Sequence, residues 1–191
     1  MGIWVTKQFL GNLSYQGFSN NEEGDNPLQL DWLLLAIRRD STNALYHRRL
    51  AAHSARILTD PYKLRAYAER MGYLNSPYKS YPLWEYLETP ERQALWLLIE
   101  VIIPHYKRAL ELSPLDAEAC IELGWAYHSL ATLMEVHPGG YRLSRHYIDM
   151  SKACFQRALE LAPKDTVIKK YVEEWQKETK VDVSEVHISR D

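Results

Sequence analysis

The sequence predicts an all-α protein in which a helical unit repeats along the chain, and three observations support this prediction. A phrase occurs as YKRALELSP from Tyr106, as FQRALELAP from Phe155, and in weaker form as LLLAIRRDS from Leu33. Small residues recur at matched distances from these phrases. Glycine is scarce, whereas Ala, Leu, Glu, Lys and Arg are plentiful, and this composition favours helix.

The three phrases share one register. Their aligned alanines are Ala36, Ala109 and Ala158, which stand 73 and 49 residues apart. A second matched position follows 15 residues after each alanine and is occupied by Ala51, Gly124 and Glu173. The small residues there indicate that a partner helix approaches closely. Glu173 falls in the last predicted helix, which has no following partner and resembles a solvent-facing cap.

Proline and aspartate mark the ends of the predicted helices. Pro114 and Pro163 each stand at the end of a repeated phrase. A helix is expected to end there, because proline has no amide hydrogen to donate and restricts the residue before it. Asp116 and Asp165 follow two residues later, where a carboxylate can cap the next helix. A turn between two helices is therefore expected at each proline.

This pattern resembles the tetratricopeptide repeat, whose 34-residue unit is a pair of antiparallel helices. The best match runs from Ala117 to Pro163 and includes Leu123, Gly124, Tyr127, Phe155 and Ala158. The resemblance implies one solenoid domain over residues 1–180 with a flexible tail at 181–191. Its predicted parts are unit 1 at about 2–40, unit 2 at about 43–113, unit 3 at about 116–163, and a capping helix at 165–179.

The spacings exceed the family's unit by 39 residues in unit 2 and by 15 residues in unit 3. The longer insertion predicts a helix over 61–71, a loop rich in Tyr and Pro over 72–89, and a helix opening at Pro90. That helix is expected to kink at Pro104 and to continue to Leu112. The shorter insertion includes the turn HPGG at 137–140, before a helix starting near Tyr141.

In the repeat family, the first helix of each unit lines the concave side of the solenoid. The resemblance therefore implies a groove-facing set: Leu45, Arg48, Ala52, Ala55 and Arg56 in unit 2; Glu118, Ile121, Trp125, His128 and Ser129 in unit 3; Val167, Lys170, Glu174 and Lys177 in the cap. The candidate partner-binding residues among them are Arg48, Arg56, Ile121, Trp125, His128 and Lys170.

The resemblance implies a non-catalytic scaffold or adaptor that binds a protein or peptide through this groove. Cations beside a Trp platform suit an extended segment with an acidic or carboxylate group and one apolar anchor. The alternative is that the cations are solvated helix residues and that Trp125 packs against the insertion. Ala52 and Trp125 stand where the family's carboxylate clamp has Asn, so that clamp is not carried over.

The longer insertion contains a second candidate surface, made of Tyr73, Tyr78, Tyr81, Trp84 and Tyr86. Prolines interleave these aromatic residues and stiffen the segment. Such a segment can form a docking patch for a partner. It can equally fold back to cover the apolar sides of a short solenoid or fill its groove, and both interpretations stay open.

Other classes of function find little support in the residues. The net charge of −2 supplies no basic field for nucleic acid. The seven histidines show no zinc-ligand spacing, and nucleophile-elbow, P-loop and dinucleotide motifs are absent from the sequence. We therefore expect no enzyme activity, metal or cofactor. Cys120 and Cys154 leave two options, a single disulfide or two buried thiols, of which the thiols are favoured.

Two alternatives to the scaffold function stay open. The phrase AIRRDSTNALYHRRLA is similar to repeat segments of larger bacterial membrane-associated or exported proteins, and the start at GIWVTKQF would then be a cut site. A metal or cofactor site around His128, His137 and His146 is the other alternative. A cytoplasmic location without direct membrane insertion is expected, with a periplasmic or tethered one if the chain is an excerpt. A homodimer through the N-terminal unit is a further candidate assembly.

Overall fold

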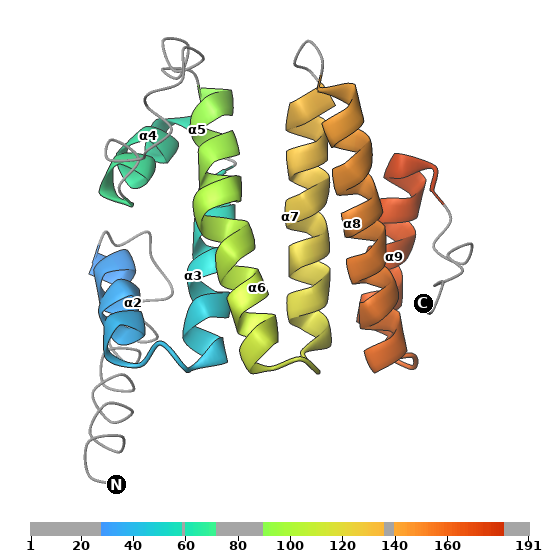
Figure 1. The fold of residues 1–191 in the computed structure, drawn as a ribbon, viewed down its shortest axis with the longest axis horizontal. Helices are drawn as coiled ribbons and strands as arrows, with labels where there is room; N and C mark the ends of the chain where they lie inside the picture. The colour runs from blue at the N-terminus through green and yellow to red at the C-terminus, as the bar shows by residue number, and fades with distance from the viewer. Residues whose placement is uncertain (1–27, 59, 72–89, 136–139, 182–191) are drawn as a thin grey trace, which may run out of the picture. The chain divides into compact units, whose positions relative to one another are not determined.

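The computed structural model describes residues 28–58, 60–71, 90–135 and 140–181, and within these ranges the chain is helical with no strand (Figure 1). The all-α prediction is therefore confirmed for the described residues. The chain divides into two compact units, Met1–Pro114 and Leu115–Asp191, and each is described by itself. The boundary falls between the predicted units 2 and 3. The single domain over 1–180 stays a prediction.

The central helix of the first compact unit is α3 (Ala44–Ile57), which packs against α2 (Leu28–Arg39) and α6 (Ile103–Leu112). Asn43 caps α3, since its side-chain oxygen accepts a hydrogen bond from the Leu45 amide at 3.1 Å. The small residues of the repeat register, Ala36, Ala51 and Ala109, are all buried. Their burial is consistent with helix contacts at these positions, while the repeat arrangement stays a prediction.

One long helical segment runs from Pro90 to Leu112 as α5 (Pro90–Leu97), the π-helix η4 (Leu98–Ile102) and α6. Pro104 explains the change of pitch, because it has no amide hydrogen and its ring crowds the carbonyl group four residues back. In η4 the Ile103 amide donates to the Leu98 carbonyl, five residues away. The irregularity predicted at Pro104 thus takes the form of a π-turn, and the helix ends at Leu112 as predicted.

The inserted segment contributes α4 (Pro61–Arg70), which packs on α3 and α5. Buried Ser54 of α3 donates its hydroxyl to the Leu50 carbonyl at 2.7 Å. The Tyr67 hydroxyl lies 2.9 Å from the same Ser54 oxygen and must therefore donate to it. Arg70 forms an ion pair with Asp31 of α2. The helix predicted over 61–71 is confirmed and lies against α3, whereas residues 72–89 are outside the described ranges.

The second compact unit consists of α7 (Ala117–Glu135), α8 (Tyr141–Leu161) and α9 (Thr166–Thr179). Asp116 caps α7 by accepting from the Ala119 amide at 2.9 Å. Asp165 caps α9 by accepting from the amides of Val167 and Ile168. Both predicted caps are confirmed, as is the start of α8 at Tyr141. Most of the predicted HPGG turn lies outside the described residues.

Helices α7 and α8 run antiparallel and pack along their length, and α9 packs on both (Figure 1). The two helices approach closely at Gly124, where an added Cβ would lie 3.1 Å from the Phe155 ring. Ser151 of α8 donates its hydroxyl to the Gly124 carbonyl at 2.8 Å. Ala158, two turns after Ser151 on α8, is fully buried. Gly124 is therefore small for the predicted reason.

Candidate functional site

The predicted partner-binding residues of the first compact unit are Arg48 and Arg56. They stand eight residues apart on α3, which places them about 80° apart around the helix axis. Arg48 is half-buried and Arg56 is exposed, and both take part in interactions within the structure. The insertion residues Tyr73, Tyr78, Tyr81, Trp84 and Tyr86 lie outside the described residues.

In the second compact unit, Trp125 and His128 meet on α7. Their ring centroids are 5.5 Å apart and the rings meet edge to face. The half-buried Trp125 also contacts the Phe155 ring of α8, at 5.7 Å between centroids. Phe155 in turn contacts Trp175 of α9 at 5.0 Å, and Phe155 and Trp175 are fully buried. A continuous aromatic stack thus supports Trp125 from the core.

His128 connects α7 to α9. Its Nε2 lies 3.2 Å from Oε2 of Glu178, and because a carboxylate can only accept, Nε2 carries the hydrogen. Nδ1 is then an acceptor in the neutral ring, and this buried atom has no hydrogen-bond partner in the described part of the chain. The ring is therefore held in one orientation with one polar atom unused.

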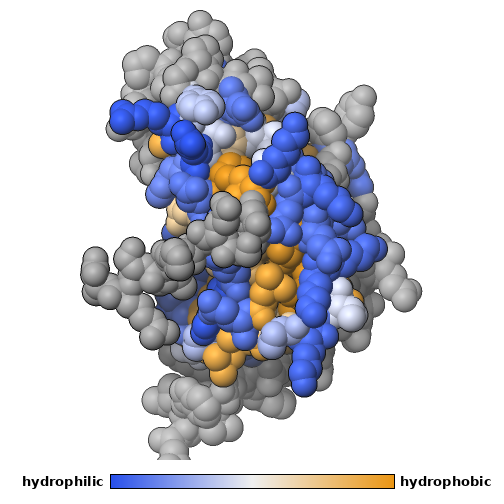
Figure 2. All heavy atoms as spheres, turned by 90° about the vertical axis from the view of Figure 1, so that its right-hand side faces the viewer, coloured by the Kyte–Doolittle hydropathy of each residue, from blue (hydrophilic) through white to orange (hydrophobic). Residues whose placement is uncertain are grey.

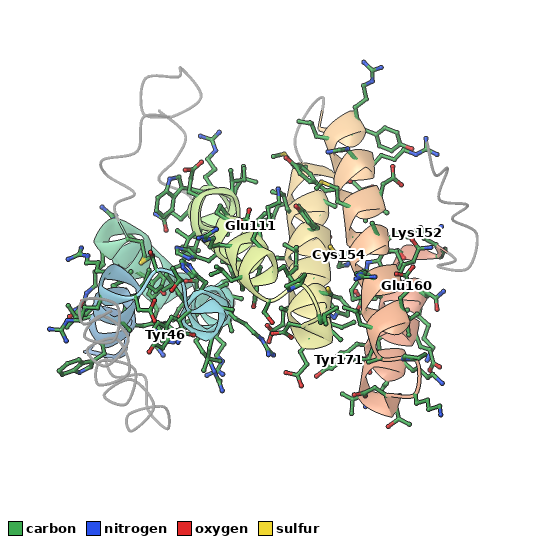
Figure 3. The ribbon with its side chains drawn as sticks, turned by 60° about the horizontal axis from the view of Figure 1, so that its bottom comes forward. Tyr46, Glu111, Lys152, Cys154, Glu160 and Tyr171 are labelled. Atoms are coloured by element: carbon green, nitrogen blue, oxygen red, sulfur yellow. The ribbon has the colours of Figure 1, made fainter. Side chains whose placement is uncertain are left out.

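Helix α9 presents further residues on the face that carries Glu178. Tyr171 and Glu174 precede Glu178 by seven and four residues, so all three share one face of the helix. Tyr171 is 44% exposed and lies on the side of α9 turned toward α7 (Figure 3). We define Trp125, His128, Tyr171, Glu174 and Glu178 as the α7–α9 surface.

Two other predicted site residues have different surroundings. Ile121 is 5% exposed and belongs to the buried residues of α7. Lys170 is exposed and forms an ion pair with Glu174 at 3.9 Å. With Glu174 and Glu178 nearby on the same helix, Lys170 does not give this surface an excess of positive charge. The acidic peptide inferred from the family register therefore gains no support from α9.

Apolar side chains are also exposed on α9 in the second compact unit. Figure 2 shows the face on the α9 side, where apolar side chains form a strip bordered by hydrophilic ones. The large hydrophobic residues exposed on α9 are Val167, at 59%, and Tyr171. This helix therefore offers apolar area next to charged side chains, a mixture typical of protein-binding surfaces.

A second polar cluster joins α3 to α6, and the sequence had not singled it out. Nδ1 of His47 lies 2.8 Å from Nδ1 of His105. The ring centroids are 5.0 Å apart and the ring planes differ by 25°, so the rings meet edge to edge. Nε2 of His47 also lies 3.0 Å from the Ser41 carbonyl oxygen, which can only accept. His47 thus carries its hydrogen on Nε2, and His105 donates from Nδ1.

The surroundings keep both rings of this cluster neutral. Burial lowers the pKa of His47 below its ordinary value of 6.5, against the opposing effect of the hydrogen bond to Ser41. Burial and the adjacent His47 lower the pKa of His105 to about 4. The cluster is therefore an uncharged hydrogen-bonded pair at neutral pH.

The repeat register identifies the counterpart of this pair in the second compact unit. The steps of 73 and 49 residues match His47 with Cys120 of α7 and His105 with Cys154 of α8. Both cysteines lie in described helices, and neither forms a disulfide, as the favoured option predicted. Burial raises the pKa of the Cys120 thiol. Cys154 lies between the ribbons of α7 and α8 (Figure 3).

Neither a metal centre nor a membrane span is found in the parts of the chain that the structure describes. Among these residues, no group of three or more His, Cys, Asp or Glu side chains is placed to hold a metal ion. His137 lies outside the described ranges, so the alternative site around His128, His137 and His146 stays a prediction. Of the described helices, none is long and apolar enough to cross a bilayer.

Comparisons with protein-family models, with curated proteins and with solved structures each gave no match to this chain.

Proposed function

We propose that this chain is a non-catalytic binding module of the tetratricopeptide type, which holds a segment of a protein partner on the α7–α9 surface. The observation that carries the proposal is the contact of Trp125 with His128, backed by Phe155 and tied to α9 through Glu178. Aromatic side chains held by such contacts lose little conformational freedom on binding. Trp residues are also frequent hot spots of protein interfaces.

The matched helix pairs support the repeat assignment. Pairs α3–α6 and α7–α8 both place small residues of one register at buried positions. In the repeat family the first helices carry the binding residues, and α3, α7 and α9 occupy that place in the register. In α3 these residues are Arg48 and Arg56, which we propose as cationic contacts. A cytoplasmic location belongs to the same proposal.

The chemistry of the α7–α9 surface suggests what it binds. Trp125 and Tyr171 provide aromatic faces for an apolar side chain. Glu174 and Glu178 provide carboxylates that accept hydrogen bonds and favour positive charge. A segment with one apolar anchor and a neighbouring Lys, Arg or amide donor fits these groups.

A peptide selection tests the proposal. Displayed random peptides are selected on the purified chain, and the affinity of the best peptide is measured by calorimetry for wild type, Trp125→Ala and Tyr141→Ala. Tyr141 is an exposed aromatic residue at the start of α8 and serves as the matched control. We expect roughly a tenfold loss of affinity for Trp125→Ala, and no loss for Tyr141→Ala. Equal affinities for wild type and Trp125→Ala would remove the surface from consideration, and Arg48→Glu tests α3 separately.

A further inference from the structure

The histidine pair between α3 and α6 has no role in the proposed binding function, yet it is among the most constrained polar contacts of the molecule. His47 is 6% exposed and contacts both the Ser41 carbonyl and His105 of α6. Its neighbour Asp40 is also buried and accepts hydrogen bonds from the amide and hydroxyl of Thr42. His105 is half-buried, and the hydrogen position on each ring is defined by its contacts.

The number of protons on the pair determines whether its hydrogen bond can form. In the neutral pair, His105 donates from Nδ1 to His47. With one added proton, His47 can donate from both nitrogens, and His105 accepts if its remaining hydrogen moves to Nε2. With two added protons, both Nδ1 atoms carry hydrogen and face each other at hydrogen-bonding distance. The bond is then lost and two like charges meet.

We propose that His47 and His105 form an acid-sensitive latch, which holds α3 against α6 while the rings are neutral and releases that contact when both are protonated. The latch acts on the principal helix contact of the first compact unit, because α3 is the helix on which α2, α4, η4 and α6 all pack. Its release therefore loosens this unit, which also carries Arg48 and Arg56.

The charged groups around the latch come from several elements. Arg108 of α6 opposes protonation of His47, whereas Asp40 after α2 and Glu111 of α6 favour it. Arg108 and Glu111 form an ion pair with each other at 2.8 Å. Because their charges are opposite, their effects on the protonation of His47 oppose each other. Glu100 of η4 is not among the charges that act on either ring. Helix α4 contacts α3 two turns further along, at Ser54.

The direction of the pH effect follows from proton binding. Both pKa values lie below the ordinary 6.5, with that of His105 at about 4, so the folded chain binds fewer protons than the unfolded chain within this window. The stability due to the pair is therefore complete above pH 6.5 and is lost as the pH falls toward 4. Acid, not base, opens the latch.

Nitrogen-detected NMR of the histidine rings in the full wild-type chain tests the geometry directly. At neutral pH we expect His47 to be protonated on Nε2 and His105 on Nδ1, with coupling between the rings across their hydrogen bond. On acidification we expect both rings to protonate only below the ordinary imidazole pKa of 6.5. The same tautomer on both rings, or protonation of both rings at the ordinary pKa of 6.5, would overturn the proposal.

A variant tests the consequence for stability. In His105→Asn, the side-chain amide can donate to His47 in place of Nδ1 but does not titrate. Thermal unfolding is followed at neutral pH and near the acid end of the window, with His146→Asn as the control. We expect acidification to lower Tm of wild type and His146→Asn by roughly 5–10 °C more than Tm of His105→Asn. An equal loss in all three proteins would refute the latch, and if His105→Asn does not fold, the wild-type titration decides.

Discussion

The helix pairs α3–α6 and α7–α8 are built on one register but carry different chemistry at one pair of matched positions. The correspondences are Ala51 with Gly124, Tyr106 with Phe155, His47 with Cys120, and His105 with Cys154. All the small and aromatic residues in this set are buried. At the other two positions, a hydrogen-bonded imidazole pair stands in one unit and two thiols stand in the other.

The difference separates two kinds of constraint. Where the helices approach closely, the size of the side chain is limited, since an added Cβ at Gly124 already crowds Phe155. At the neighbouring positions, the two side chains need only meet each other's hydrogen-bonding requirements. Thiols behave as small apolar groups that need no partner, whereas imidazoles need their hydrogen bonds. Packing therefore constrains the positions at the helix contact, while the adjacent positions can carry different chemistry.

The largest effect is expected for Gly124→Val. Its branched side chain must displace the Phe155 ring and disturb the bond from Ser151, at a cost of about 3 kcal/mol. Urea unfolding monitored by circular dichroism measures this loss. The matched change Ala51→Val adds less volume to a site that already holds a Cβ, so a smaller loss is expected there. Equal losses would show that the two contacts are not packed differently.

Exchanging the chemistry of the matched pair is expected to have the next largest effect. In His47→Cys/His105→Cys, the Ser41 carbonyl loses its donor and the smaller thiols leave space, so stability at neutral pH falls by about 2 kcal/mol. The stability of the variant should vary less with pH than that of wild type as the pH falls from 6.5. Chemical unfolding of the variant and of wild type at several pH values provides the comparison. If the stability of both proteins varies equally with pH, the account is contradicted.

Helix α4 has no counterpart in the described part of the second unit, and Tyr67→Phe measures what it contributes. The change removes the hydroxyl that donates to Ser54, while Ser54 keeps its own bond to the Leu50 carbonyl. A loss of about 1 kcal/mol is expected in urea unfolding. No loss would mean that α4 does not depend on this bond for its place on α3.

The smallest effect is expected at the ion pair between Asp31 of α2 and Arg70 of α4. Both side chains are substantially exposed, so water screens their attraction. Asp31→Asn should cost roughly 0–1 kcal/mol, and the loss should shrink with added salt. A loss of stability larger than that of Tyr67→Phe would show that the Asp31–Arg70 ion pair, and not the Tyr67 hydroxyl, contributes most to holding α4 in place.

Local chemistry explains which features the sequence predicted. The caps Asp116 and Asp165 and the irregularity before Pro104 follow from a few neighbouring residues, and the structure confirms them. The close approach at Gly124 followed from a repeated register. Each of these features can be predicted from the residues of one helix or from one repeated spacing.

Contacts between distant helices explain what the sequence did not predict. The pairing of His47 with His105 depends on how α3 meets α6 across the long insertion. Glu178 reaches His128 because Trp175 packs on Phe155 and thereby fixes the rotation of α9. No short-range spacing encodes either contact. The grouping of Trp125 with His128 was predictable because both lie on one helix.

Side-chain NMR distances in the full chain test the shared register most directly. We predict contacts between the Gly124 α-protons and the Phe155 ring, and at the matched position between the Ala51 methyl group and the Tyr106 ring. Finding both contacts would establish that the two helix pairs repeat one packing arrangement. Finding the first contact without the second would contradict the account, because the register that matches His47 with Cys120 would then not describe α3 and α6.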